Sequence, residues 1–235
     1  MMPTSSLPLG IRENLVQFTH QLVQVLLVGF AIGMTRTVIP ALAETEFGVV
    51  RGSFVMLTVF VMAFGVVKAV MNFVAGRLSE RIGRKRVLLL GWLVALPIPI
   101  MIWAAPNWSW IVASTVLLGV NQGLCWSMTQ TSKLDITRAD RRGLTMGFNE
   151  FSGYVGVALA GVITAYSAEA LGARLGLLVF GMAVVVLGIF LTVVWIKDTL
   201  PWASPGWPTN SRPGASTCKP ERSCWPDPSP NPPPP

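Results

Sequence analysis

The chain has 235 residues, of which 52% are hydrophobic and 12% are charged, with a net charge of +7 and a mean hydropathy of +0.57. A soluble protein of this length carries about twice that charged fraction, so the composition excludes an ordinary soluble domain. The positive charge does not indicate nucleic-acid binding, because no basic soluble domain is present to carry it.

Six apolar stretches are long enough to cross a hydrocarbon core of about 30 Å as helices. In chain order they are residues 19–43, 53–75, 87–105, 109–131, 144–167 and 172–196. A helix hydrogen-bonds its own backbone, as lipid requires, and the strict alternation typical of a β-barrel strand is absent. We therefore predict an all-α membrane protein with six transmembrane helices.

The spans divide the sequence into three parts. We predict an N-terminal segment at 1–18, a six-helix transmembrane domain at 19–199 and a Pro-rich tail at 200–235. Proline makes up about a third of the tail, and it has no N–H group to offer to a helix or a sheet. We therefore expect the tail to be disordered.

Basic residues gather in alternate connections between the spans. The connections after the second and fourth spans hold Arg77, Arg81, Arg84, Lys85, Arg86, Lys133, Arg138, Arg141 and Arg142. The remaining connections hold only Arg51 and Arg174. Because short basic loops stay in the cytoplasm, we predict a multi-pass protein of the plasma or inner membrane with both termini cytoplasmic.

The connection after the second span reads Gly76-Arg-Leu-Ser-Glu80-Arg81-Ile-Gly83-Arg84-Lys85-Arg86. It resembles the signature loop that the major facilitator superfamily places between spans 2 and 3. Six residues match the pattern: Gly76, Glu80, Arg81, Gly83, Lys85 and Arg86. The sequences Arg141-Arg142-Gly143 and Lys197-Asp198-Thr199 are also similar to the family, so the resemblance covers about residues 15–200.

This resemblance implies one six-helix half of a major facilitator fold, with spans 1–3 and 4–6 related as a 3+3 inverted repeat. In the family, the acid of the loop latches the cytoplasmic sides of the two halves in the outward-open state. Gly76, Glu80 and Arg81 take that latch role by resemblance. For Lys85 and Arg86, a role in setting topology is an equally good interpretation.

Five polar residues at membrane depth are the predicted substrate or coupling surface. They come from spans 1, 4 and 5, which line the central cavity in the family: Arg36, Asn121, Gln122, Asn149 and Glu150. If Arg36 faces the cavity, its guanidinium favours an anionic substrate. The alternative is that Arg36 extends to the outer headgroups, that Lys68 extends inward and that Glu150 pairs with a basic residue near the cytoplasmic surface.

No motif indicates an enzyme, a cofactor or a metal. No Gly-rich phosphate loop is present, and His20 has no ligand partner at metal spacing. The family's markers of drug–proton antiport are also missing, because Gly119 stands where an Arg is usual and span 5 has no Gly-Pro pair.

We therefore predict a secondary transporter of a small solute, working by alternating access and in contact with membrane lipid. Six spans are half the number in a usual family member. Three alternatives follow: a truncated chain that lacks its C-terminal half, a homodimer, or a non-transporting interaction protein. We favour truncation, because the family pattern ends at Thr199. The fold alone does not select a substrate.

Overall fold

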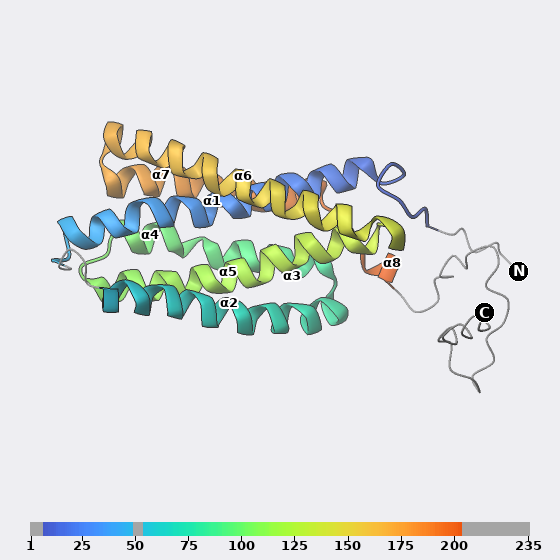
Figure 1. Cartoon of the computed structure of the whole chain (residues 1–235), viewed down its shortest axis with the longest axis horizontal. Helices are drawn as coiled ribbons and strands as arrows, with labels where there is room; N and C mark the ends of the chain where they lie inside the picture. The colour runs from blue at the N-terminus through green and yellow to red at the C-terminus, as the bar shows by residue number, and fades with distance from the viewer. Residues whose placement is uncertain (1–6, 49–53, 204–235) are drawn as a thin grey trace, which may run out of the picture. The chain divides into compact units, whose positions relative to one another are not determined.

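A computed structural model describes residues 7–48 and 54–203, and every regular element in these ranges is a helix (Figure 1). Residues 1–6 of the predicted N-terminal segment and 204–235 of the predicted tail lie outside the described residues. The elements are α1 (Leu15–Thr45), α2 (Phe54–Ile82), α3 (Arg84–Ala95), α4 (Pro97–Trp103), α5 (Trp108–Asp135), the 3₁₀ turn η1 (Ala139–Arg141), α6 (Arg142–Leu171), α7 (Ala173–Trp195) and α8 (Leu200–Ala203).

Six of these segments are long and apolar enough to cross a membrane, as the sequence predicts. Four are single helices, the third span consists of α3 followed directly by α4, and the fifth consists of η1 followed directly by α6. The break falls at Leu96, just before Pro97, which has no N–H for the helical ladder. The Leu96 N–H bonds instead to the Leu93 carbonyl, so the turn tightens without interrupting the span.

The connection predicted as a loop at 76–86 is instead almost entirely helical. The α2 helix continues to Ile82 and α3 begins at Arg84, so Gly83 alone separates them. The residues from Arg77 to Ile82 are mostly good helix formers, and polarity does not unwind a helix that leaves the membrane. Gly83 has φ +94°, and a Cβ there would collide with the Asp198 carboxylate, so only glycine fits.

The most extensive contact between helices joins α1 and α6 (Figure 1). Their backbones approach closely where side chains are absent: a Cβ on Gly29 would meet the Gly153 carbonyl, and one on Gly156 would meet the Leu26 carbonyl. Gly153 and Gly156 therefore permit close contact between the two helices. Two-thirds of the apolar window of α1 is buried inside the bundle.

Two helices are much less covered than α1. Only 6% of the apolar window of α2 and 17% of that of α6 is buried within the chain. Large apolar side chains stand exposed along both helices, including Val61, Val66 and Phe73 of α2 and Phe151 and Tyr166 of α6. These faces are suited to contact with lipid or with further helices.

Candidate functional site

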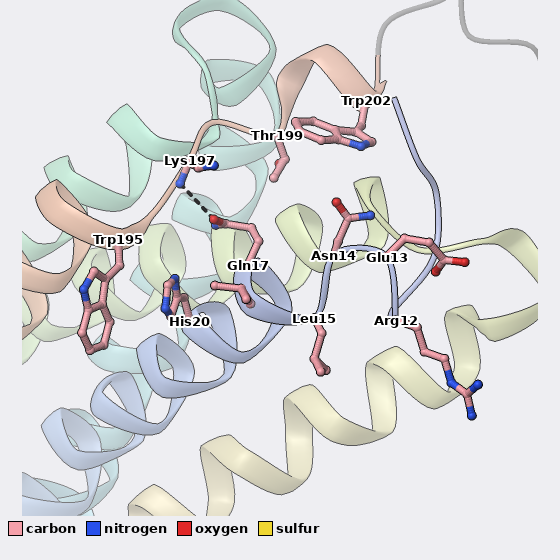
Figure 2. Close-up of a pocket in the computed structure, with 11 residues that line it drawn as sticks. Arg12, Glu13, Asn14, Leu15, Gln17, His20, Trp195, Lys197, Thr199 and Trp202 are labelled. Carbon is pink, nitrogen blue, oxygen red and sulfur yellow. Dashed lines mark hydrogen bonds between the residues drawn. The ribbon is translucent and has the colours of Figure 1, made fainter. Parts of the chain in front are cut away.

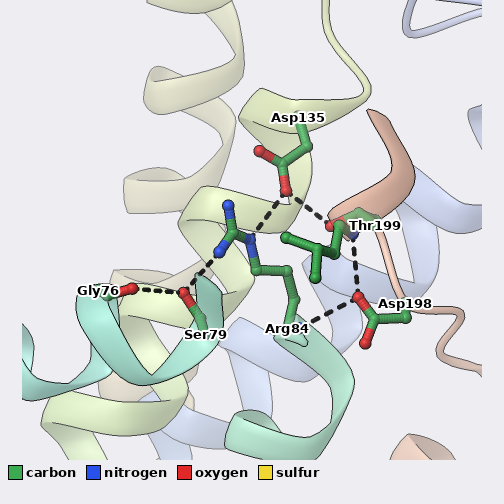
Figure 3. Close-up of polar contacts among 7 residues, drawn as sticks. Gly76, Ser79, Arg84, Asp135, Asp198 and Thr199 are labelled. Atoms are coloured by element: carbon green, nitrogen blue, oxygen red, sulfur yellow. Dashed lines mark hydrogen bonds and ion pairs between the residues drawn. The ribbon is translucent and has the colours of Figure 1, made fainter. Parts of the chain in front are cut away.

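The signature residues lead into a buried polar network at the end of the bundle where α2 meets α3 (Figure 3). The Ser79 hydroxyl donates to the Gly76 carbonyl at 2.8 Å and accepts from Arg84 Nη1 at 2.6 Å. Arg84 Nε donates to Asp135 Oδ2 at 3.1 Å. The Arg84 and Asp135 side chains are 7% and 10% exposed, so this ion pair is nearly dry.

The segment after α7 completes the network. Thr199 Oγ1 donates to the same Asp135 oxygen at 2.9 Å. Asp198 Oδ1 accepts the backbone N–H of Arg84 at 3.1 Å and that of Leu200 at 2.9 Å. We call Ser79, Arg84, Asp135, Asp198 and Thr199 the Arg84 network. It fastens together the ends of α2, α3, α5 and α7 by charge-assisted hydrogen bonds.

The predicted latch residues lie around this network rather than inside it. Glu80, Arg81 and Arg86 are exposed, and none of them makes an ion pair with another described residue. Lys85 Nζ donates to the Val193 carbonyl of α7 at 2.9 Å, a helix–helix contact that neither the latch nor the topology interpretation included. The latch role of the exposed residues stays a prediction.

Sequence reasoning missed the centre of the network. It counted Arg84 only as a basic topology residue and placed Lys133 in a loop after the fourth span. The α5 helix in fact continues to Asp135. Arg84 and Asp135 are 51 residues apart in the chain, so no local sequence pattern predicts their ion pair. The one available signal was an uninterrupted helix-forming sequence at the end of span 4.

Three of the five predicted cavity residues are buried within the bundle: Asn121, Gln122 and Asn149. Asn121 Nδ2 donates to the Gly91 carbonyl of α3 at 3.0 Å, and Gln122 Nε2 donates to the Val28 carbonyl of α1 at 2.8 Å. Both residues are fully buried. These bonds hold α5 against its neighbours, and the side-chain oxygens of both residues have no partner among the described residues.

Glu150 contacts Trp126, a residue that was not predicted as part of the site, and it is also hydrogen-bonded to Asn149. Glu150 Oε1 accepts from Asn149 Nδ2 at 2.9 Å and from Trp126 Nε1 of α5 at 3.1 Å. The Trp126 ring contacts Tyr154 of α6 edge-on, at 6.0 Å between centroids. Lys68 Nζ of α2 lies over the same Trp126 ring, 4.9 Å from its centroid.

We call Lys68, Trp126 and Glu150 the tryptophan cluster. Lys68 is half-buried and forms no ion pair with a described residue, although Glu150 and Arg36 are near enough to act on it electrostatically. Arg36, the fifth predicted residue, is exposed on α1. The expectation that Lys68 simply extends inward to the membrane surface omitted this cation–π contact.

Lys133 is the most enclosed charged residue of the described chain. Its side chain is 0% exposed, and Nζ donates to the Gln21 carbonyl of α1 at 3.1 Å. The Gln21 side-chain amide is also fully buried, and neither of its polar atoms has a partner within the described residues. A cation in this position is costly, which marks the α1–α5 contact as more than apolar packing.

An all-helical bundle with six apolar spans is the architecture of a multi-pass membrane protein. The sequence model of the Major Facilitator Superfamily matches residues 22–230, which is most of the chain. The chain belongs to this superfamily. The match continues beyond Thr199, the residue at which we expected the family pattern to end.

Individual proteins give the same picture at lower identity. The proton-coupled antiporter flippase LtaA of Staphylococcus saprophyticus is 30% identical over 147 residues, covering 62% of this chain and 35% of that protein. The crystal structure of the human organic anion transporter MFSD10 (TETRAN) superposes with a TM-score of 0.63 at 16% identity, covering 81% of this chain and 49% of that one. The chain thus spans half or less of the length of these relatives.

Proposed function

We propose that this chain is a six-helix half of a secondary transporter that moves a small organic anion by alternating access. Its tryptophan cluster and Arg36 would supply one wall of the solute site. The observation that carries the proposal is Lys68, a cation at membrane depth that rests on an aromatic ring instead of a carboxylate. A charge at membrane depth is energetically costly, and such charges therefore usually have a function.

The names of the similar proteins also support transport of an organic solute. One is named for organic anion transport and the other for proton-coupled antiport. Two cations, Arg36 and Lys68, stand near a single carboxylate, Glu150, so the local balance favours an anionic solute. The exposed apolar faces of α2 and α6 fit a second six-helix body, either a separate half or another copy of this chain. The distribution of Lys and Arg supports cytoplasmic termini in a plasma or inner membrane.

A counterflow assay tests transport. Liposomes containing the purified chain would be loaded in turn with aromatic carboxylates, dicarboxylates and organic phosphates, and exchange of radiolabel would be measured. We expect exchange of at least one anion class, and a fall of about tenfold or more in Lys68→Gln, because a hydrogen bond to a charged group contributes about 1.5–3 kcal/mol. Arg138→Gln, which removes an exposed charge from a connection, is the matched control.

The mass of the detergent-solubilised particle separates the alternatives. Exchange by a particle of two chains supports a homodimer, whereas exchange only after co-expression with a separate C-terminal half supports a divided transporter. Absence of exchange by every anion class in both arrangements would contradict the proposal and favour a non-transporting membrane protein.

A further inference from the structure

A pocket of about 320 Å³ lies where α1 begins and α7 ends (Figure 2). Arg12, Gln17, His20, Trp195, Lys197 and Trp202 line it, and we call it the α1–α7 pocket. Both spans terminate here, so the pocket lies at the boundary between hydrocarbon and headgroups. Tryptophan is enriched at that depth, which agrees with the two indole rings in the lining.

The inner wall of the pocket carries polar atoms that no described residue satisfies. Gln17 Oε1 accepts the backbone N–H of Lys197 at 3.3 Å, and Gln17 Nε2 is buried without a partner among residues 7–48 and 54–203. The His20 ring stacks on Trp195 at 4.7 Å and 17°, and its Nδ1 is likewise buried with no partner in these ranges. An amide nitrogen can only donate a hydrogen bond, and an imidazole nitrogen donates when it is protonated. A ligand that fits this wall therefore carries hydrogen-bond acceptors.

The outer rim of the pocket is cationic. Arg12 and Lys197 are exposed and make no ion pair with a described residue. Glu13 is the only carboxylate among the described residues of the lining, and in Figure 2 it points away from Gln17 and His20. The neighbouring Asp198 is occupied by the backbone N–H groups of Arg84 and Leu200. Unused donors therefore outnumber acceptors around the cavity.

We propose that the α1–α7 pocket binds a phosphate oxyanion, supplied by the headgroup of an anionic phospholipid or by a free organic phosphate. A phosphate group offers several acceptor oxygens, which match Gln17 Nε2, His20 Nδ1 and the rim cations. The volume lies at the lower end of small-ligand sites, and basic groups at a membrane boundary attract anionic headgroups. This site lies apart from the tryptophan cluster and does not depend on transport.

Native mass spectrometry of the full chain in detergent tests the site and separates its two sources. The delipidated protein would be titrated with phosphatidylglycerol, with diacylglycerol, which has the same tails but no phosphate, and with glycerol phosphate. We expect one phosphatidylglycerol to bind about tenfold more tightly than diacylglycerol, by analogy with the strength of a charge-assisted hydrogen bond. Displacement of that lipid by equimolar glycerol phosphate would assign the site to a soluble phosphate; resistance to displacement would assign it to the lipid.

Three variants locate the binding. Gln17→Glu keeps an oxygen for the Lys197 N–H but replaces the free donor with a repelling carboxylate, and we expect it to abolish the preference. His20→Phe keeps the stacking on Trp195 and removes Nδ1, and we expect a loss of roughly threefold to tenfold. Arg138→Gln, which removes an exposed charge outside the pocket, should retain the wild-type preference.

Two results would overturn the proposal. One is equal binding of both lipids, together with no binding of glycerol phosphate, by the wild-type chain. The other is an equal loss in Arg138→Gln and Gln17→Glu, because this would show attraction to the surface charge in general. Circular dichroism and melting temperature of each variant establish that the fold is retained.

Discussion

The Arg84 network and the tryptophan cluster both contain a cation and a carboxylate, but the fold pairs them differently. In the network, Arg84 and Asp135 are in direct contact, and Thr199 completes the shell of the carboxylate. In the cluster, Lys68 rests on the Trp126 ring, while Glu150 accepts hydrogen bonds from neutral groups. Charges with matched partners fix the architecture, whereas charges without them remain available to a ligand.

The largest expected effect comes from breaking the network. Arg84→Ala should lower the free energy of unfolding by about 3–5 kcal/mol, because it leaves Asp135 buried without its counter-ion. The measurement is the unfolding free energy in mixed detergent micelles. Asp135→Asn is the matched comparison: its oxygen can still accept from Arg84 and Thr199, so it should cost less. Equal stability of Arg84→Ala and the wild type would show that the network is incidental.

An intermediate effect is expected at the edge of the network. Thr199→Val keeps the shape of the side chain and removes one of the two hydrogen bonds to Asp135 Oδ2. We expect a loss of about 1 kcal/mol in the same unfolding measurement. Thr45→Val is a suitable control, because its hydroxyl bonds an exposed carbonyl within its own helix. A loss in Thr199→Val as large as that in Arg84→Ala would mean that the segment after α7, and not the ion pair, carries the stability.

The smallest effect on stability is expected in the tryptophan cluster. Lys68→Gln should change the unfolding free energy by less than about 1 kcal/mol, since a partly exposed cation on a ring contributes about that much. Its effect should fall on anion exchange instead. A strongly destabilised Lys68→Gln protein would place Lys68 with the architectural residues and erase the contrast between the two regions.

The six spans could be predicted because apolar length alone decides them. Their limits could not, because helices such as α2 and α5 continue past the apolar part into charged sequence. The connection at 76–86 illustrates this: it looks like a loop by polarity, yet Gly83 is its only break. Helix propensity and the later contact with Asp198 decide that point, and only the first is local.

The candidate site was predictable in part. Polarity at membrane depth selected Arg36 and Glu150, and Glu150 does meet Trp126. The same criterion selected Asn121 and Gln122, which bond the backbones of neighbouring helices. A polar side chain in a span serves either a ligand or a helix contact, and packing between segments far apart in sequence decides which of the two.

The single-residue join at Gly83 has a mechanical consequence. A connection of one residue has no slack, so α3 must follow any tilt of α2, and the Arg84 network passes the same displacement to the ends of α5 and α7. We therefore expect the ends of α2, α3, α5 and α7 to move together. Inserting extra residues beside Gly83 would lengthen this connection, and we expect α2 then to tilt independently of α3, α5 and α7.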